Sequence, residues 1–287
     1  MRWLSRSKSQ QTMPKPPTPP AAPGTAGNAR AANRVPRPVS ALARSDPAGH
    51  VIAPHRHARE QLIYAIRGVM TIRANGSIWT IPASHALWMP ARVVHEIRMD
   101  TAVEMRTLYF RPGTVPGMPS DCSVLAVTPL LRELILRALS LRSRYDTAGA
   151  EGRLMRVMTD EVALLRRRPL SLRLPTDKRL ARLCDHVLAH VDGSESIAEL
   201  GRRVGLSERS VIRRFPLETG LSLHRWRQQA RLMRAFSLME QGHAVTRIAL
   251  ELGYGSPAAF GKMFRKLTGH SPRAAARLRI EEEGAFR

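Results

Sequence analysis

The chain has 287 residues, which is enough for two modest domains that each bury a core of their own. Its 46 lysine and arginine residues outnumber 23 aspartate and glutamate residues, and this net charge of +23 favours a polyanionic partner or an acidic membrane surface. Two isolated cysteines and the absence of long apolar runs exclude zinc fingers, disulfide scaffolds and membrane-spanning segments, and predict a cytoplasmic protein without membrane partners.

Residues 1–38 carry basic but no acidic side chains and include the run MPKPPTPPAAPGTAG. They contain almost no large apolar side chains, so burial cannot offset the entropy cost of ordering them. We expect a disordered tail rich in proline and alanine. A start codon assigned too far upstream would explain the same composition.

Short β-type runs separated by turn residues follow over residues 39–112, among them HVIAP, QLIYAIRG, SIWTIP and MRTLYF. Strands this short and evenly spaced predict a small sandwich or barrel rather than a parallel sheet with helices. This segment is the candidate sensor domain.

Residues 113–177 change to helical periodicity. Leu130, Leu134 and Leu141 predict one amphipathic helix, and an equivalent stripe begins at Leu154. These stripes cover the barrel or form a homodimer face, and the sequence does not separate the two alternatives. A basic, proline-punctuated linker, RRRPLSLRLPTDK, follows at residues 166–178.

The C-terminal part, residues 178–280, contains a duplicated unit and is followed by a short tail at residues 281–287. Gly205 and Phe215 in the first copy recur as Gly253 and Phe264 in the second. Each copy predicts a helix, a glycine turn and a second helix, which is the helix-turn-helix arrangement that places its second helix in the DNA major groove. Residues 222–241 predict a connecting helix of about 30 Å, close to one turn of DNA.

This C-terminal part resembles the DNA-binding domain of the AraC/XylS family of bacterial transcriptional regulators. The resemblance rests on ARLMRAFSLME and IALELGYGSPAAFGKMFRKLTGHSP. It implies double-stranded operator DNA as the partner, RNA polymerase as a further partner, and DNA contacts from both second helices. The implied DNA-contacting residues are Ser207, Arg209, Ile212 and Arg213 in the first unit and Ser256, Ala258, Ala259 and Lys262 in the second. Since the second helix contains Gly261 and one base-facing cation, we expect looser sequence discrimination there.

Two segments resemble the cupin motifs, in which three histidines and a glutamate hold a divalent metal inside a small β-barrel. The first is Gly49-x5-His55-x-His57-x3-Gln61-x6-Gly68, and the second is Pro90-x-Arg92-x2-His95. Gln61 replaces the carboxylate, with Glu60 displaced to the opposite strand face, and Arg92 replaces a glycine. Both changes lower the expected metal affinity, although three neutral imidazoles at His55, His57 and His95 still suit zinc or nickel.

Two alternatives to a metal site stay open: a polar effector pocket without metal, or histidines that satisfy buried hydrogen bonds. The predicted effector pocket comprises His55, His57, Gln61, Tyr64, Trp88 and His95.

Together these features predict a multidomain α+β protein with an N-terminal cupin-like β-barrel, a helical linker and a C-terminal all-α domain. The predicted function is a sequence-specific transcriptional regulator, activator or repressor, that responds to a small molecule. A looser resemblance is to cupin-bearing family members that control an adjacent transporter gene. The alternative is a metal-dependent cupin enzyme fused to a DNA-binding module, but the sequence indicates no catalytic residues.

Overall fold

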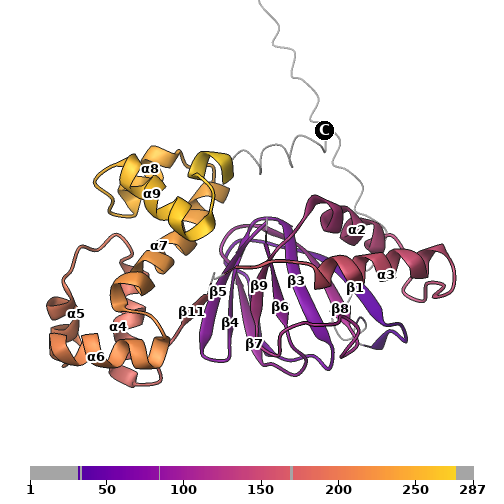
Figure 1. Cartoon of the computed structure of the whole chain (residues 1–287), viewed down its shortest axis with the longest axis horizontal. Helices are drawn as coiled ribbons and strands as arrows, with labels where there is room; N and C mark the ends of the chain where they lie inside the picture. Colours follow the sequence, from indigo (N-terminus) through magenta and orange to yellow (C-terminus); the bar gives the residue numbers. More distant parts are fainter. Residues whose placement is uncertain (1–31, 33, 84, 169–170, 276–287) are drawn as a thin grey trace, which may run out of the picture.

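The structure is a computed structural model that describes residues 32, 34–83, 85–168 and 171–275. Most of the predicted N-terminal tail and the predicted tail at residues 281–287 lie outside these described residues. Figure 1 shows a β-sandwich flanked on one side by α2 (Pro129–Leu139) and α3 (Ala150–Ala163) and on the other by the C-terminal helices. The predicted multidomain α+β organisation is confirmed.

Within the described residues, antiparallel strands form two sheets that face each other. Sheet A has the order β1 (Val39–Asp46), β8 (Val103–Phe110), β3 (Glu60–Arg67), β6 (His85–Met89), β9 (Ser123–Ala126) and β10 (Arg167–Arg168). Sheet B has the order β11 (Ser171–Arg173), β5 (Ser77–Pro82), β4 (Val69–Ala74), β7 (His95–Met99) and β2 (Val51–His55).

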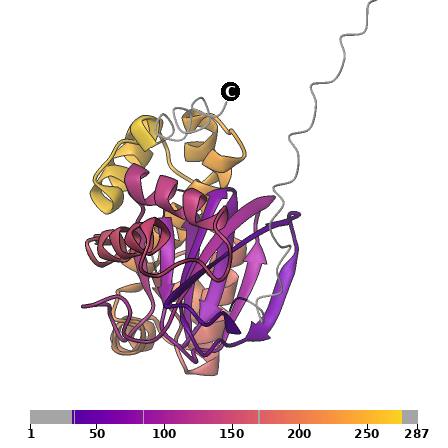
Figure 2. The same cartoon turned by 90° about the vertical axis from the view of Figure 1, so that its right-hand side faces the viewer.

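Side-chain alternation along β3 shows which residues face the sandwich interior. Ile63 and Ala65 pack with residues of sheet B, whereas Leu62 and Tyr64 pack with α2 and α3. This two-residue period is expected for a strand with different cores on its two faces. The helices α2 and α3 therefore cover the outer face of sheet A, as one of the two sequence alternatives proposed, and Figure 2 shows the same layering from a second direction.

The C-terminal helices form two helix-turn-helix units joined by one long helix. The helices are α4 (Lys178–Ala189), α5 (Ile197–Arg203), α6 (Glu208–Thr219), α7 (Leu223–Glu240), α8 (Val245–Glu251) and α9 (Pro257–Thr268). A capping box between Ser196 and Glu199 begins α5, and Gly205 and Gly253 occupy left-handed turns at φ values of 69° and 72°. Among the described helices, including α7, we find none with the length and hydrophobicity needed to cross a membrane.

The helix α7 packs against the outer face of sheet B. The indole Nε1 of Trp226 donates a hydrogen bond of 3.0 Å to the carbonyl of Arg173 in β11. The other end of α7 is held by Glu240, whose Oε1 accepts a hydrogen bond of 2.9 Å from the backbone N–H of Gly68. The sandwich and the DNA-binding helices are thus connected at both ends of α7.

Two segments differ from the sequence-based expectations. The region expected to be a helical linker, residues 113–177, also contains β9, β10 and β11; Arg167 pairs with Leu125 and Ser171 pairs with Trp79. These strands are two to four residues long, too short for a period-two pattern to emerge. The described end of the expected tail is also bound, because Arg59 donates hydrogen bonds to backbone carbonyls of residues 35, 37 and 38.

Candidate effector pocket and DNA interface

Three histidines converge in the sandwich, as the sequence motifs predict. His55 lies at the end of β2, His57 in the following turn, and His95 at the start of β7. Their ring centroids are 4.3 Å apart for His55 and His95, 4.8 Å for His55 and His57, and 5.4 Å for His57 and His95. One nitrogen from each ring lies within 4.8 Å of the others, so a single metal ion could contact all three.

Local backbone geometry brings these histidines together. His55 pairs with His95 across β2 and β7, next to an irregularity in the ladder that follows Ile52. The N–H of Arg92 donates a hydrogen bond of 2.7 Å to the carbonyl of His57, which joins the turn before β7 to the turn after β2. Arg92 adopts a left-handed φ of 66°, which explains why cupin motifs place a glycine here. Its side chain is exposed, so the guanidinium can extend into solvent away from the buried histidines.

Hydrogen bonds fix the tautomers of two of the rings. The Nδ1 of His55 lies 2.8 Å from the carbonyl of Ala53, and the Nδ1 of His95 lies 3.0 Å from the carbonyl of Val93. Since a carbonyl can only accept, each Nδ1 carries the proton and each Nε2 keeps its lone pair. This is the tautomer in which an imidazole binds a metal through Nε2 while its other nitrogen is held by the protein.

Burial keeps the imidazoles of His57 and His95 neutral. The pKa of His57 falls to about 4 because burial disfavours its charged form and because His55 and His95 lie close by. Burial likewise lowers the pKa of His95 to about 4, against the opposing effect of its hydrogen bond to Val93. Both residues are therefore neutral at pH 7, as metal ligands must be.

The donor set fits a divalent transition metal. The Nε2 of His95 is buried and has no hydrogen-bond partner among the described residues, which leaves an unsatisfied acceptor on the ring edge away from its bonded Nδ1. Zinc and nickel both accept imidazole nitrogen, and three such ligands leave at least one coordination position for another molecule.

Further polar groups lie on the same sandwich interior. Gln61 is 3 % exposed and Thr107 is 1 % exposed, and the Oε1 and Oγ1 atoms of these side chains have no hydrogen-bond partner. Tyr109 pairs with Gln61 across β3 and β8, and its ring lies edge-on to His57 at 5.2 Å. The predicted site did not include Thr107, although the alternation along β8 places it, like Tyr109, on the interior face.

The structure places Tyr64 and Trp88 elsewhere. Both belong to the cluster between sheet A and the helices α2 and α3, and the indole of Trp88 donates a hydrogen bond of 3.2 Å to the carbonyl of Pro119. The expectation that they line the histidine pocket is wrong because even-numbered residues of β3 and β6 point outward from the sandwich. Their aromatic character reflects packing beneath the helices.

The second helix of the first unit, α6, presents the predicted DNA-contacting side chains to solvent. Arg209, Ile212 and Arg213 are exposed, whereas Val211 and Phe215 are buried on the opposite face. Ile212 is 55 % exposed, which is unusual for a large apolar side chain and suits contact with a thymine methyl group. Ser207 is exposed and caps the helix by accepting a hydrogen bond from the N–H of Ser210.

The corresponding helix of the second unit, α9, has the same amphipathic design, with a single cation, Lys262, in the N-terminal half of its outer face. Ala258, Ala259 and Lys262 are exposed, and Phe260 and Phe264 are buried. Ser256 caps this helix through the N–H of Ala259. Both helices therefore offer an exposed N-terminal half, the part of a recognition helix that contacts bases.

Comparison with known proteins agrees with this architecture. Residues 37–196 match the family described as AraC-like ligand binding domain, and residues 200–277 match the family described as Helix-turn-helix domain. The HTH-type transcriptional regulator NimR of Escherichia coli is 34% identical over 231 residues, which cover 78% of this chain and 82% of NimR. The chain belongs to the AraC family of transcriptional regulators.

Two further comparisons are more distant. The arabinose operon regulatory protein of Salmonella typhimurium is 27% identical over 226 residues, covering 72% of this chain and 79% of that protein. The crystal structure of ToxT from Vibrio cholerae with a bound unsaturated fatty acid shares 11% sequence identity at a TM-score of 0.36, covering 83% of this chain and 94% of ToxT.

Family membership gives both halves of this AraC-family protein a general function. It is a DNA-binding transcriptional regulator whose N-terminal sandwich is a ligand-binding domain. The histidine cluster lies inside the sandwich, and the exposed faces of α6 and α9 lie on the helix-turn-helix units.

Proposed function

We propose that this regulator changes its affinity for operator DNA when the site formed by His55, His57 and His95 is occupied. The observation that carries this proposal is the convergence of three imidazoles, two of them buried and kept neutral, with their ligand nitrogens within 4.8 Å of one another. Buried polar groups are normally hydrogen-bonded, so the Nε2 of His95, which has no partner among the described residues, favours a bound ligand at this cluster.

A divalent metal, zinc or nickel, is the occupant that the three imidazoles favour. His55 and His95 would hold it through Nε2, and His57 completes the protein donor set. Such a metal supplies Lewis acidity and an open coordination position for a polar effector group. Gln61 and Thr107 provide hydrogen-bonding groups on the same interior face, so the polar atoms of an effector would find partners there with or without the metal.

A short route connects this site to the DNA-binding helices. His95 in β7 pairs with Ala74 in β4, and β4 is the strand that follows Gly68. The N–H of Gly68 is bonded to Glu240 at the end of α7, which connects the two helix-turn-helix units. A change in β7 on effector binding would reach α7 through this strand pair, and coupling of about 1–3 kcal/mol is typical of such regulation.

At the DNA, the first unit supplies the more discriminating contacts. Arg209 and Arg213 can each make paired hydrogen bonds to a guanine, whereas Lys262 is a point charge suited to phosphate. Ile212, Ala258 and Ala259 contribute apolar contacts, and the caps Ser207 and Ser256 lie at the helix ends nearest the DNA.

Partners beyond DNA are part of the proposal. Exposed apolar side chains support a homodimer: Leu130 lies in α2, Val157 lies in α3, and Leu164 directly follows α3. RNA polymerase contact and control of a neighbouring transporter gene follow from the family resemblance. We propose a regulatory rather than an enzymatic role, because the relative that matches most of the chain is a transcriptional regulator.

DNA binding is tested with the full chain and the DNA upstream of its own gene, including the region shared with a divergent neighbour. Fluorescence anisotropy should show specific binding that weakens with salt as counterions are released. Equal affinity for a scrambled duplex at physiological salt would contradict the proposal.

Metal occupancy of the histidine cluster is tested with untagged protein that has been purified without a chelator. Element analysis should find zinc or nickel, and added metal should raise the melting temperature of metal-free protein by mass action. His57→Ala should abolish this increase, whereas His50→Ala, which removes an exposed imidazole of the sandwich, should retain it. Less than about 0.1 metal per chain together with no thermal shift would rule out the metal and leave the polar effector alone.

A further inference from the structure

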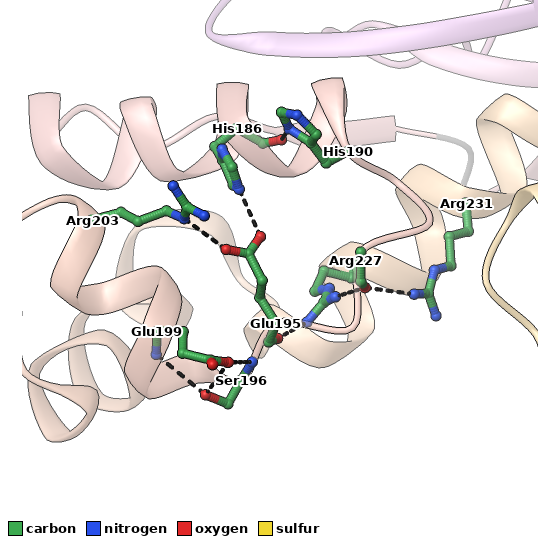
Figure 3. Close-up of polar contacts among 9 residues, drawn as sticks. His186, His190, Glu195, Ser196, Glu199, Arg203, Arg227 and Arg231 are labelled. Atoms are coloured by element: carbon green, nitrogen blue, oxygen red, sulfur yellow. Dashed lines mark hydrogen bonds and ion pairs between the residues drawn. The ribbon is translucent and has the colours of Figure 1, made fainter.

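The loop between α4 and α5, residues 190–196, is tied to the first helix-turn-helix unit through Glu195. Figure 3 shows the carboxylate of Glu195 between His186 and Arg203, which lie on the neighbouring helices α4 and α5. It lies 2.7 Å from the Nε2 of His186 in α4 and accepts a hydrogen bond of 2.6 Å from the Nε of Arg203 in α5. The loop is therefore fixed relative to α4 and α5.

Two arginines of the connecting helix α7 hold the backbone of this loop. Arg227 donates to the carbonyls of Glu195, at 2.7 Å, and Gly193. Arg231, one helical turn further along, donates to the carbonyls of Val191 at 2.8 Å and Gly193 at 3.0 Å. Hydrogen bonds from a guanidinium are charge-assisted, and its planar fork holds two acceptors in a fixed geometry, which the rotating ammonium group of a lysine does not provide.

The same loop contacts the second helix-turn-helix unit. A Cβ atom at Gly253, in the turn between α8 and α9, would overlap the carbonyl oxygen of Asp192. The guanidinium of Arg231 also lies over the ring of Tyr254, 5.3 Å from its centroid. Val191 packs against the apolar clusters of both units. Loop, arginines and second turn thus form one continuous set of contacts between the two units.

We infer that residues 190–196, held by Arg227 and Arg231 and in contact with Gly253, fix the position of the second recognition helix relative to the first and thereby select the spacing of the two DNA half-sites. Arg227 and Arg231 are positioning residues in this scheme. The inference rests on the proposed DNA contacts of α6 and α9.

The physical reason is the helical geometry of DNA. Adding or removing one base pair between two half-sites rotates one relative to the other by about 35°. Two recognition helices locked in one arrangement can satisfy a single spacing, whereas helices joined by α7 alone would adapt by bending or rotation. Loss of the contacts should broaden the range of spacings without changing the bases that each helix prefers.

The first test measures binding of the full chain to operators with one or two base pairs added or removed between the half-sites. Wild-type affinity should fall about tenfold on a change of one base pair. Arg231→Gln should bind all spacings within about threefold of one another. Arg234→Gln removes the same charge from an exposed position of α7 and should keep the wild-type spacing profile. Arg231→Lys, which retains the charge and some of the hydrogen bonding, should give an intermediate profile.

The duplicated turns supply a second, independent pair of variants. Gly253 and Gly205 have nearly the same left-handed φ, 72° and 69°, so alanine is equally strained at either position. Only at Gly253 would the new Cβ meet the loop, since Gly205 has no heavy atom within 4 Å of the corresponding position among the described residues. Gly253→Ala should shift or broaden the preferred spacing, and Gly205→Ala should leave it unchanged.

The outcomes separate this inference from the proposed function. Variants are compared after thermal unfolding and binding to single half-sites show that both units are folded. Unchanged spacing profiles for Arg231→Gln and Gly253→Ala would overturn the inference, as would a wild-type protein that binds every spacing equally well. A wild-type protein with no specific operator binding would overturn the proposed function and this inference together.

Discussion

Acidification should destabilise the metal-free protein through His95. Burial lowers the pKa of this residue from 6.5 to about 4, so between these pH values the unfolded chain binds the proton more readily than the folded one. The stabilisation is complete above pH 6.5 and is lost as the pH falls toward 4. At about 1.4 kcal/mol per pH unit, His95 should contribute a loss of about 2–3 kcal/mol in the free energy of unfolding between pH 7 and pH 4.5.

The assay is urea unfolding in the presence of a chelator, followed by the fluorescence of the sandwich tryptophans, for wild type and His95→Gln. Glutamine is neutral throughout, so the pH-dependent loss for the variant should be smaller by about 2–3 kcal/mol. His50→Gln removes an exposed imidazole and should follow the wild type. If His95→Gln loses as much stability as wild type on acidification, His95 is not held neutral by its environment and the pocket geometry is wrong.

Three further predictions concern the DNA-contacting helices, the backbone at Arg92 and the contact between Glu240 and Gly68. Arg213→Ala should reduce the free energy of operator binding by about 1–3 kcal/mol and relax the preference at one base pair, whereas Lys262→Ala should weaken binding to operator and random DNA alike and lower the slope of log affinity against log salt by about one. A base-substitution series across the operator with each variant distinguishes the two effects, and the opposite pattern would reverse the roles of α6 and α9. Arg92→Gly should raise the free energy of unfolding by about 0.5–1 kcal/mol in urea unfolding, because glycine relieves the left-handed φ of 66°; lower stability would contradict this. Glu240→Ala removes the acceptor for the N–H of Gly68 and should diminish the effect of metal on DNA affinity, whereas Glu240→Gln keeps an acceptor and should preserve that effect. Identical responses of the two variants in fluorescence anisotropy would show that this contact does not couple the metal site to the DNA-binding helices.

The sequence predicts the elements that carry strong local signals. The run QLIYAIRG becomes β3, and the capping serines Ser196, Ser207 and Ser256 begin α5, α6 and α9. The histidine cluster is also predictable, because the spacing of His55 and His57 and the later His95 match a known barrel motif. These signals lie within a few residues of one another or repeat along the chain.

The features that sequence analysis missed depend on contacts between distant segments. Tyr64 and Trp88 resemble pocket residues in composition, but only the pairing of β3 with β6 shows that they face α2 and α3. The strand β11 contains too few residues to show a period, and it forms because β5 and Trp226 offer partners to its backbone. The contact between Glu240 and Gly68 spans 172 positions of the chain, and no local pattern marks it.

The most direct test of the central claim combines both domains in one measurement. Operator affinity of the full chain is measured by anisotropy at fixed salt while zinc or nickel is titrated into metal-free protein, with His57→Ala and His50→Ala in parallel. We expect metal to change the operator Kd of wild type and of His50→Ala by at least about fivefold and to leave the operator Kd of His57→Ala unchanged. An operator Kd that is the same at every metal concentration, in a protein whose melting temperature shows that metal is bound, would contradict it.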